Sequence, residues 1–280
     1  MAVRDDAETA PPILRCKDHQ APSVFTPEAL LREARRQKGV EARCVPEICI
    51  LDPDGDMVRY LLAANRGWRL PHWACYHTDL CGFDHAGLRY GIVGCAVGAA
   101  FAVLVAEELF ACGCELLLSV TSAGQIAPIQ EPPYFVIIDR ALRDEGTSYH
   151  YLPPADYSRA DQRLVKLAEQ ALAATDMSAQ VGATWTTDAP FRETHEAIAA
   201  ALAAQILAVE MEAAALYAFA AARQKQVLCL AHVTNQMGSV EGDFEKGDAD
   251  GAQESLRVVS AIGDAWRDTS QVDQPETNLS

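Results

Sequence analysis

The feature that most restricts the fold of this chain is the alternation of short apolar runs with stretches of helical length. Runs of strand length lie at 47–51, 90–94, 115–122, 134–139, 181–187 and 227–234. Helical patterns lie at 56–64, 99–112, 158–174, 196–204, 212–224 and 252–266, with residues 205–209 leading into the fifth of these. Strands that alternate with helices build sheets covered on both faces. We therefore expect an α/β protein, a single three-layer αβα domain with a mixed, largely parallel central sheet.

The two ends of the chain differ from this alternating middle. One more helix is predicted between Thr26, a capping residue followed by Pro27, and Gly39, which follows a basic last turn. Residues 1–22 are polar and contain prolines, which predicts a flexible N-terminal arm, and residues 267–280 read as a polar C-terminal tail. No linker divides the part between them, so residues 23–266 are expected to form the one domain.

Charge limits the partners that this chain can have. Its formal net charge is −16, which argues against binding to nucleic acid or to an anionic membrane. Any bound anion must therefore be held by local donor groups that act against the overall negative charge. The first residues form no apolar signal segment, and the longest uncharged stretch, 91–106, is too short to span a bilayer. We expect a cytoplasmic protein.

Cysteine use supports the same compartment. The chain has 9 cysteines, an odd number, and several lie inside apolar runs, where a thiol behaves as a small hydrophobic group. Cys112 and Cys114 are close in sequence, but no second pair stands at a spacing typical of zinc sites. We expect reduced thiols and no metal.

In sheets of this kind the ligand binds where the strands end. The polar segments at the predicted strand ends are 52–59, 119–125, 186–194 and 234–238, together with the turn at 209–212. In the first of them Gly55 precedes a helix start and Arg59 lies in its first turn, an arrangement suited to an anion. An ordinary turn with a surface arginine explains the same residues.

Three further segments have both a functional and an ordinary explanation. Ser122 follows an apolar strand and its hydroxyl can bond a phosphate or ribose oxygen, or it simply begins a loop. Glu210 and Glu212 flank a methionine at a helix start, where carboxylates can bind vicinal hydroxyls or only complement the helix dipole. Asn235 after Thr234 can donate and accept toward a heterocyclic base, or form a turn.

Taken in order, these segments resemble one family. Residues 208–217, Ala-Val-Glu-Met-Glu-Ala-Ala-Ala-Leu-Tyr, resemble the ribose-binding signature of the purine nucleoside and uridine phosphorylases. Residues 51–59 look like their phosphate loop, 119–124 like the strand end of their phosphate and ribose sites, and 186–193 like their base-stacking loop. The resemblance to this nucleoside phosphorylase/nucleosidase superfamily covers about 25–265, and residues 140–154 favour the uridine phosphorylase-like branch.

The resemblance implies cleavage of a ribose–base bond, with phosphate as co-substrate and no cofactor. It implies a catalytic set of Glu212, Asn235 and Arg59, and the residues divide by the part of the substrates that they hold. The residues implied to bind phosphate are Gly55, Arg59 and Ser122, and those implied to bind ribose are Glu210, Met211 and Glu212. The residues implied to bind the base are Phe191, Arg192, Thr234 and Asn235. It also implies a homo-oligomer (dimer, trimer or hexamer) whose sites borrow side chains, with His19, His77 and His85 as candidates.

The chain departs from the family pattern at three places. Ser119 stands where many phosphorylases have an arginine, and neither His77 nor Thr78 supplies a second one; each loss costs about 1.5–3 kcal/mol. Asn235 stands where purine-specific members have an aspartate, which disfavours adenosine-type substrates and favours a 6-oxopurine or a pyrimidine. Hydrolysis by water and a non-catalytic binding role remain alternatives. Arginines from elsewhere could replace the missing ones: Arg89, Arg140 or Arg192.

Overall fold

A computed structural model describes residues 11–177, 179–238, 241–244 and 246–272 of the chain. In that part a single ten-stranded sheet is formed by β1 (Ile48–Asp52), β2 (Gly67–Arg69), β3 (Cys81–His85), β4 (Leu88–Gly94), β5 (Leu116–Gln125), β6 (Tyr134–Asp144), β7 (Tyr157–Arg159), β8 (Ala179–Thr187), β9 (Ile206–Glu210) and β10 (Gln226–Asn235). The α-helices are α1 (Pro27–Lys38), α2 (Asp56–Ala63), α3 (Ala99–Ala111), α4 (Gln162–Ala173), α5 (His195–Ala203), α6 (Ala213–Arg223) and α7 (Ala252–Val272). The predicted α/β class is confirmed.

The sheet is mixed, and part of it closes on itself. β1 lies parallel to β4 and β5, and β5 lies parallel to β10. β6, β8 and β9 form a second parallel set, joined to the first by the antiparallel pairs β10–β6 and β5–β9. The strands β5, β10, β6, β8 and β9 therefore form a closed ring, while β1, β4, β3 and β2 extend outward as an open sheet.

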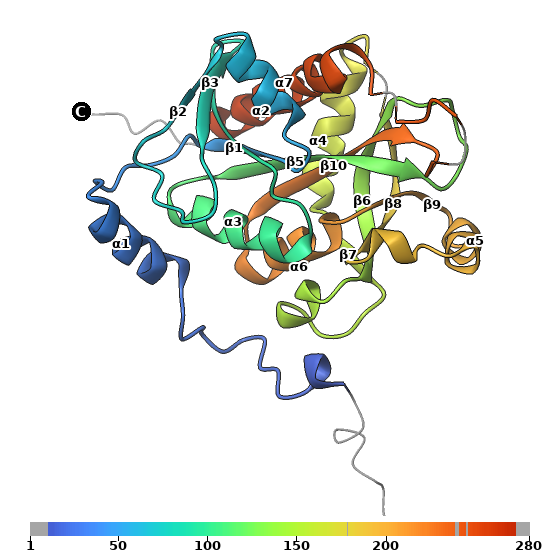
Figure 1. Ribbon diagram of the computed structural model, residues 1–280, viewed down its shortest axis with the longest axis horizontal. Helices are drawn as coiled ribbons and strands as arrows, with labels where there is room; N and C mark the ends of the chain where they lie inside the picture. Colours follow the sequence, from blue (N-terminus) through green and yellow to red (C-terminus); the bar gives the residue numbers. More distant parts are fainter. Residues whose placement is uncertain (1–10, 178, 239–240, 245, 273–280) are drawn as a thin grey trace, which may run out of the picture.

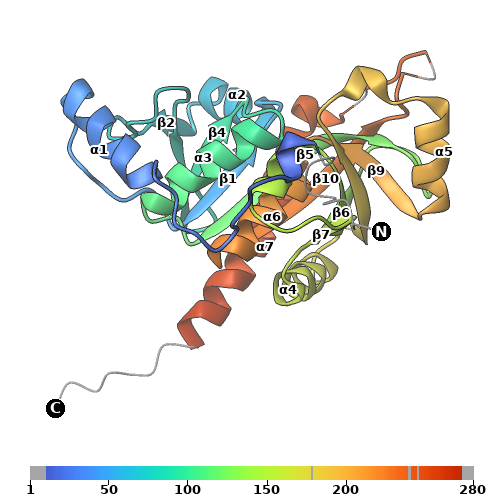
Figure 2. The same cartoon turned by 90° about the horizontal axis from the view of Figure 1, so that it is seen from below.

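Helices cover this sheet on two sides, as Figures 1 and 2 show. α1, α3 and α6 lie on one side, and α2, α4 and α7 lie on the other. α1 and α5 lie at opposite ends of the molecule in both views. Two of the strands are almost completely buried between the layers: every residue of β1 is buried, and β10 has only its first residue exposed. The predicted three-layer arrangement is confirmed.

Local signals fixed several element boundaries as predicted. Thr26 caps α1 by accepting a hydrogen bond from the Ala29 N–H at 3.2 Å, and Gly39 ends the helix in the left-handed region with φ 65°. The predicted helix at 158–174 begins later, at Gln162, because the Asp161 side chain caps it there.

Other elements differ from the prediction because they depend on partners elsewhere in the chain. Ser158 and Arg159, the first residues of the predicted helix at 158–174, instead belong to β7, which pairs with β6. The strands β2 and β3 were not predicted; β2 pairs with β3, and β3 pairs with β4. The last helix runs to Val272, six residues beyond its predicted end at Trp266, so the predicted tail is helical over 267–272.

The predicted N-terminal arm is described from residue 11 onward. It contains a short 3-10 turn, η2 (Pro12–Leu14), and touches the body where Lys17 Nζ lies 2.8 Å from His150 Nδ1. Residues 1–10 of the arm and 273–280 of the tail lie outside the described residues, and the division into arm, domain and tail stays a prediction.

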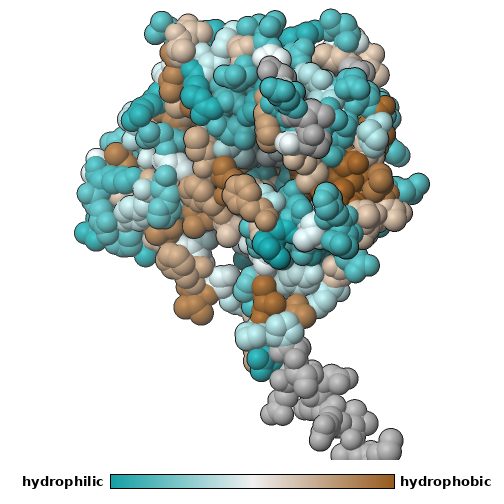
Figure 3. Space-filling view, turned by 45° about the vertical axis from the view of Figure 1, so that its right-hand side comes forward, coloured by the Kyte–Doolittle hydropathy of each residue, from teal (hydrophilic) through white to brown (hydrophobic). Residues whose placement is uncertain are grey.

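The surface reflects the high charge of the chain. The face drawn in Figure 3 is largely hydrophilic, with apolar side chains gathered in several separate areas. Within the described ranges, no helix is both long enough and apolar enough to cross a membrane.

Candidate functional site

The sheet brings the predicted strand-end segments together. Leu51 of β1 pairs with Ser119 of β5, which places the start of the 52–59 segment beside the 119–125 segment of β5. Further along β5, Gly124 pairs with Val209 of β9 on one side and with Asn235 of β10 on the other. All of these are carboxyl ends of strands, so the candidate site lies where an α/β sheet is expected to bind its ligand.

Glu212 lies at the start of α6 and is almost completely buried, with 1% of its surface exposed. Its Oε1 accepts a hydrogen bond from the Gly98 N–H, at the start of α3, at 2.7 Å. Its Oε2 lies 3.3 Å from the Met211 N–H. Burial, reinforced by the charge of Glu210, raises the pKa of Glu212 to about 8. Glu212 thus joins the N-terminal ends of two helices and holds its proton more firmly than an exposed glutamate.

Glu210 has a different environment, because both of its oxygens are engaged inside the protein. Oε1 accepts hydrogen bonds from the hydroxyls of Thr184, at 3.0 Å, and Thr186. Oε2 accepts from the N–H groups of Glu212 and Ala213, each at 2.7 Å. Two of these donors belong to the start of α6, where the Thr186 hydroxyl accepts from a third N–H group, that of Ala214, at 2.9 Å. Glu210 therefore fastens α6 to β8, and its ribose-binding role stays a prediction.

The predicted phosphate residues are joined by a continuous chain of bonds. Arg59 donates to Asp56, and Lys246 Nζ lies 2.6 Å from the other Asp56 oxygen and 3.2 Å from Asp54 Oδ2. The same Asp54 oxygen accepts hydrogen bonds from the Ser122 hydroxyl and from the Ser122 N–H, the latter at 3.2 Å. Arg59 and Ser122 are thus brought to one place, with two carboxylates and a lysine between them. We call these five residues the Asp54 cluster.

Gly55 lies beside this cluster in a conformation that requires glycine. Its φ is 76°, and a Cβ there would lie 2.7 Å from Cys95 Sγ and 2.9 Å from an Arg59 guanidinium nitrogen. Its N–H donates to the Asp52 carbonyl at 2.8 Å. The Asp52 carboxyl accepts from the Val58 N–H at 2.9 Å, and burial raises its pKa to about 7. The close packing of the 52–59 segment therefore depends on a glycine at position 55.

A buried histidine faces the same place. His232 of β10 is 4% exposed and stacks on Phe135, with the ring centroids 4.4 Å apart. Its Nε2 has no hydrogen-bond partner among the described residues. Together with Ser122, Asp54 and other residues it lines a small cavity. Burial, helped by the charge of Lys246, lowers the pKa of His232 to about 4, so the ring is neutral at physiological pH.

The predicted base-binding residues divide into a buried and an exposed pair. Asn235 donates to the Ala123 carbonyl at 3.4 Å and to the Thr234 hydroxyl at 3.3 Å, and its carbonyl accepts from the Met237 N–H at 2.9 Å. Thr234 is 1% exposed and Asn235 8%. Phe191 and Arg192 lie in the short helix η4 (Pro190–Arg192), where the Phe191 ring is 99% exposed. Phe191, predicted to stack on the base, is therefore almost fully exposed to solvent.

The departures from the family pattern can now be located. Ser119 is buried, and its hydroxyl has no partner in the part of the chain that the structure describes. Arg89 pairs with Asp84 at 2.9 Å, on the β3–β4 hairpin, and Arg140 pairs with Asp139 at 3.0 Å. Neither arginine joins the Asp54 cluster.

The cation that does join it, Lys246, was missed by sequence reasoning, as were the roles of Asp54 and His232. Lys246 lies 192 residues beyond Asp54 in the sequence, so no motif spacing links the two. The one available signal was that Lys246 is the only basic residue in the acidic stretch 238–256.

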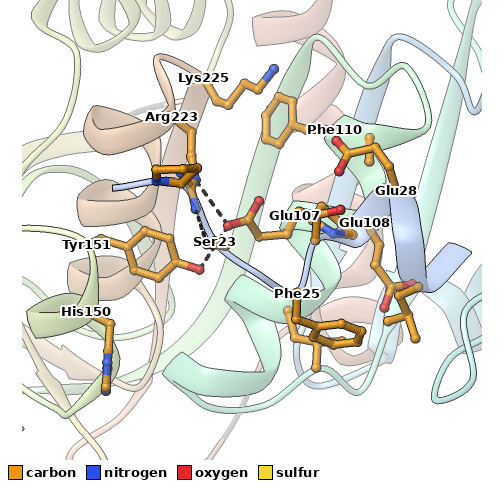
Figure 4. A pocket seen from close by; sticks show the side chains of 16 residues that line it. Ser23, Phe25, Glu28, Glu107, Glu108, Phe110, His150, Tyr151, Arg223 and Lys225 are labelled. Atoms are coloured by element: carbon orange, nitrogen blue, oxygen red, sulfur yellow. Dashed lines mark hydrogen bonds and ion pairs between the residues drawn. The ribbon is translucent and has the colours of Figure 1, made fainter. Parts of the chain in front are cut away.

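A further cavity, of about 630 Å³, lies away from this site (Figure 4). The N-terminal segment contributes Ser23, Phe25 and Glu28 to its walls, and the C-terminal end of α3 forms another part of them. The ion pair between Arg223 and Glu107 crosses it at 3.4 Å. None of the predicted site residues lines this cavity, so the candidate site remains at the strand ends.

Comparisons with known proteins point to one family. The family model of the phosphorylase superfamily matches residues 48–263. A guanosine phosphorylase of Halorubrum lacusprofundi is 29% identical over 194 residues, covering 68% of this chain and 74% of the relative. A DeoD-type purine nucleoside phosphorylase of Brevibacillus brevis is 25% identical over 169 residues, 58% of this chain and 72% of the relative.

Solved structures share the fold. A uridine phosphorylase from Vibrio fischeri superimposes with a TM-score of 0.67 at 20% identity, covering 80% of this chain and 92% of that one. A 5′-methylthioadenosine/S-adenosylhomocysteine nucleosidase from Campylobacter jejuni gives a TM-score of 0.65 at 17% identity, covering 78% and 98%. The resemblance inferred from residues 208–217 and the strand-end segments is confirmed.

Proposed function

The chain belongs to the phosphorylase superfamily, and from that premise we propose that it cleaves the N-glycosidic bond of a ribonucleoside with phosphate as the attacking group. The observation that carries the proposal is the meeting of Arg59, Ser122 and Lys246 at the strand ends. Thr121, the neighbour of Ser122, interacts with the buried Glu212. This arrangement supplies cationic and hydroxyl groups for an anion and a carboxyl group for a sugar. No separate cofactor is needed for such a displacement.

In this proposal Glu212 binds the ribose hydroxyls and Met211 packs beneath the sugar. Positive charge develops on the ribose as the base departs, and contacts that strengthen at that stage lower the barrier. The raised pKa of Glu212 lets the carboxyl group donate to one hydroxyl oxygen or accept from another. Phosphate, held by Arg59 and Ser122 with Gly55 beneath them, attacks the anomeric carbon from the other side of the sugar.

The base site favours a 6-oxopurine or a pyrimidine. Asn235 can donate and accept hydrogen bonds but cannot give a proton to the departing base, as an acidic residue could. Phe191 and Arg192 would close over the base and Thr234 would support Asn235. The relative named as a guanosine phosphorylase agrees with an oxopurine. We propose further that the protein works as a homo-oligomer in the cytoplasm, as the family resemblance implies.

One observation favours a second candidate, hydrolysis by water. The Asp54 carboxylate accepts three hydrogen bonds where an attacking phosphate would be held. Position 119, where many phosphorylases have an arginine, is a serine in this chain. A nucleosidase is also among the proteins of similar fold. In this candidate reaction water replaces phosphate and the products are free ribose and base.

The test is release of base from uridine, inosine, guanosine and adenosine, with and without phosphate. Phosphorolysis gives ribose 1-phosphate and no base release when phosphate is omitted. Arg59→Ala should then raise the KM for phosphate at least about ten-fold, because a charged hydrogen bond contributes roughly 1.5–3 kcal/mol. Arg89→Ala, which removes an exposed arginine of the β3–β4 hairpin, is the matched control. Base release at an equal rate without phosphate would refute phosphorolysis and support hydrolysis.

A further inference from the structure

Ser122 and Lys246 together form a set of donors that suits an oxyanion. The Ser122 N–H and hydroxyl point at one oxygen atom, Asp54 Oδ2, and Lys246 Nζ lies 3.2 Å from the same atom. A backbone N–H, a hydroxyl and an ammonium that converge on one negatively charged oxygen are the donor types that bind phosphate oxygens. In this structure the Asp54 carboxylate accepts from all three donors.

The charges already present in the Asp54 cluster determine whether a further anion is attracted or repelled. Two cations, Arg59 and Lys246, are paired with two carboxylates, Asp54 and Asp56. A phosphate dianion added to this balanced group would be repelled by both carboxylates, since like charges a few ångströms apart oppose each other. The Asp54 side chain is 33% exposed whereas that of Asp56 is 11% exposed, so Asp54 is the carboxylate with more contact with solvent.

The cavity next to the cluster is small, about 10 Å³, so it has room for about one water molecule while Asp54 stays in place. His232, 4% exposed, lines it with its Nε2 unpartnered among the described residues, and Ser122 lines it too. A buried ring nitrogen without a partner is costly unless a ligand or water supplies one. Gly251 packs so closely on the ring that a Cβ there would lie 2.4 Å from His232 Cε1, so the ring is held in place.

We propose that Ser122 and Lys246 form the oxyanion seat of this site and that Asp54 is a built-in competitor which phosphate must displace. Asp54 is then a specificity residue: it weakens phosphate binding in the free enzyme, and Lys246 supplies the positive charge that Ser119 does not. The inference rests on the proposed function, because it assigns the co-substrate of that same site.

The experiment measures equilibrium binding of inorganic phosphate to the full chain by titration calorimetry, without nucleoside and at fixed ionic strength. Asp54→Asn keeps the size of the side chain and removes its charge, and should tighten phosphate binding about ten-fold. Lys246→Met should weaken binding about ten-fold or more, in line with the loss of one charged hydrogen bond. Asp84→Asn, which removes an equal charge from the exposed β3–β4 hairpin, should leave the dissociation constant unchanged.

Circular dichroism melting shows whether each variant is folded. If Asp54→Asn is not folded, Asp54→Ala is tested in its place. Unchanged or weaker phosphate binding in a folded Asp54 variant overturns the proposal, as does unchanged binding in Lys246→Met. Base release, measured separately, tests the proposed function. Phosphate-dependent release with no effect of either variant on binding would refute the seat alone, whereas the expected binding changes without any base release would refute the reaction alone.

Discussion

Replacing Glu210 tests whether this motif glutamate supports the fold or holds the sugar. Glu210→Ala removes the acceptor for four donors at once: two threonine hydroxyls and the first two N–H groups at the start of α6. Loss of the helix cap costs about 1 kcal/mol. Two buried hydroxyls left without an acceptor cost about 1 kcal/mol each, and the space left by the side chain adds about 1 kcal/mol.

One effect opposes this loss. The charge of Glu210 is a cause of the raised pKa of Glu212, so its removal relieves repulsion between the two carboxyl groups. The net decrease in the free energy of unfolding should therefore be about 3 kcal/mol, a large part of the roughly 5–15 kcal/mol that holds a typical protein folded. Glu210→Gln keeps one carbonyl oxygen for two of the four donors and should lose only about half as much.

The assay is urea unfolding followed by far-ultraviolet circular dichroism at pH 7. Glu169→Ala, at an exposed position of α4, is the control and should change the free energy of unfolding by less than about 0.5 kcal/mol. A Glu210→Ala protein as stable as the wild type would refute the structural role. If that protein had also lost nucleoside binding, the family-based assignment of Glu210 to ribose would be supported instead.

Two other predictions concern Glu212 and Phe191. The folded-state pKa of Glu212, about 8, lies above the value of 4.5 for an unperturbed glutamate, so its stabilising contribution is complete below pH 4.5 and is lost as the pH rises through 8. Glu212→Gln should flatten the fall in unfolding free energy between pH 5 and pH 8 in urea titrations and abolish base release, and a pH dependence equal to that of the wild type would contradict it. Phe191→Ala should leave stability within about 0.5 kcal/mol, because the ring is 99% exposed, yet raise the KM for nucleoside; an unchanged KM in steady-state kinetics would exclude stacking.

The sequence by itself determined the features that depend on neighbours along the chain. Thr26 and Gly39 bound α1 because capping involves residues within one turn of the helix. The strand and helix alternation determined the α/β class, since burial on both faces produces continuous apolar strands. The Glu-Met-Glu segment was placed correctly at the start of a helix, and its residues carried the family resemblance that the comparisons confirmed.

Only the tertiary structure decided which distant groups meet. Closure of the ring through β10–β6 and β5–β9 depends on strand partners far apart in sequence, which periodicity does not encode. The strands β2 and β7 pair with nearer partners but have only 3 residues each, too few for a periodic pattern to show. The motif alone assigned the same role to both glutamates, whereas the fold surrounds Glu210 with four donors and places Glu212 at the junction of two helices. Lys246 and Asp54 became neighbours only through folding, because a contact between charges depends on distance in space and not on distance along the chain.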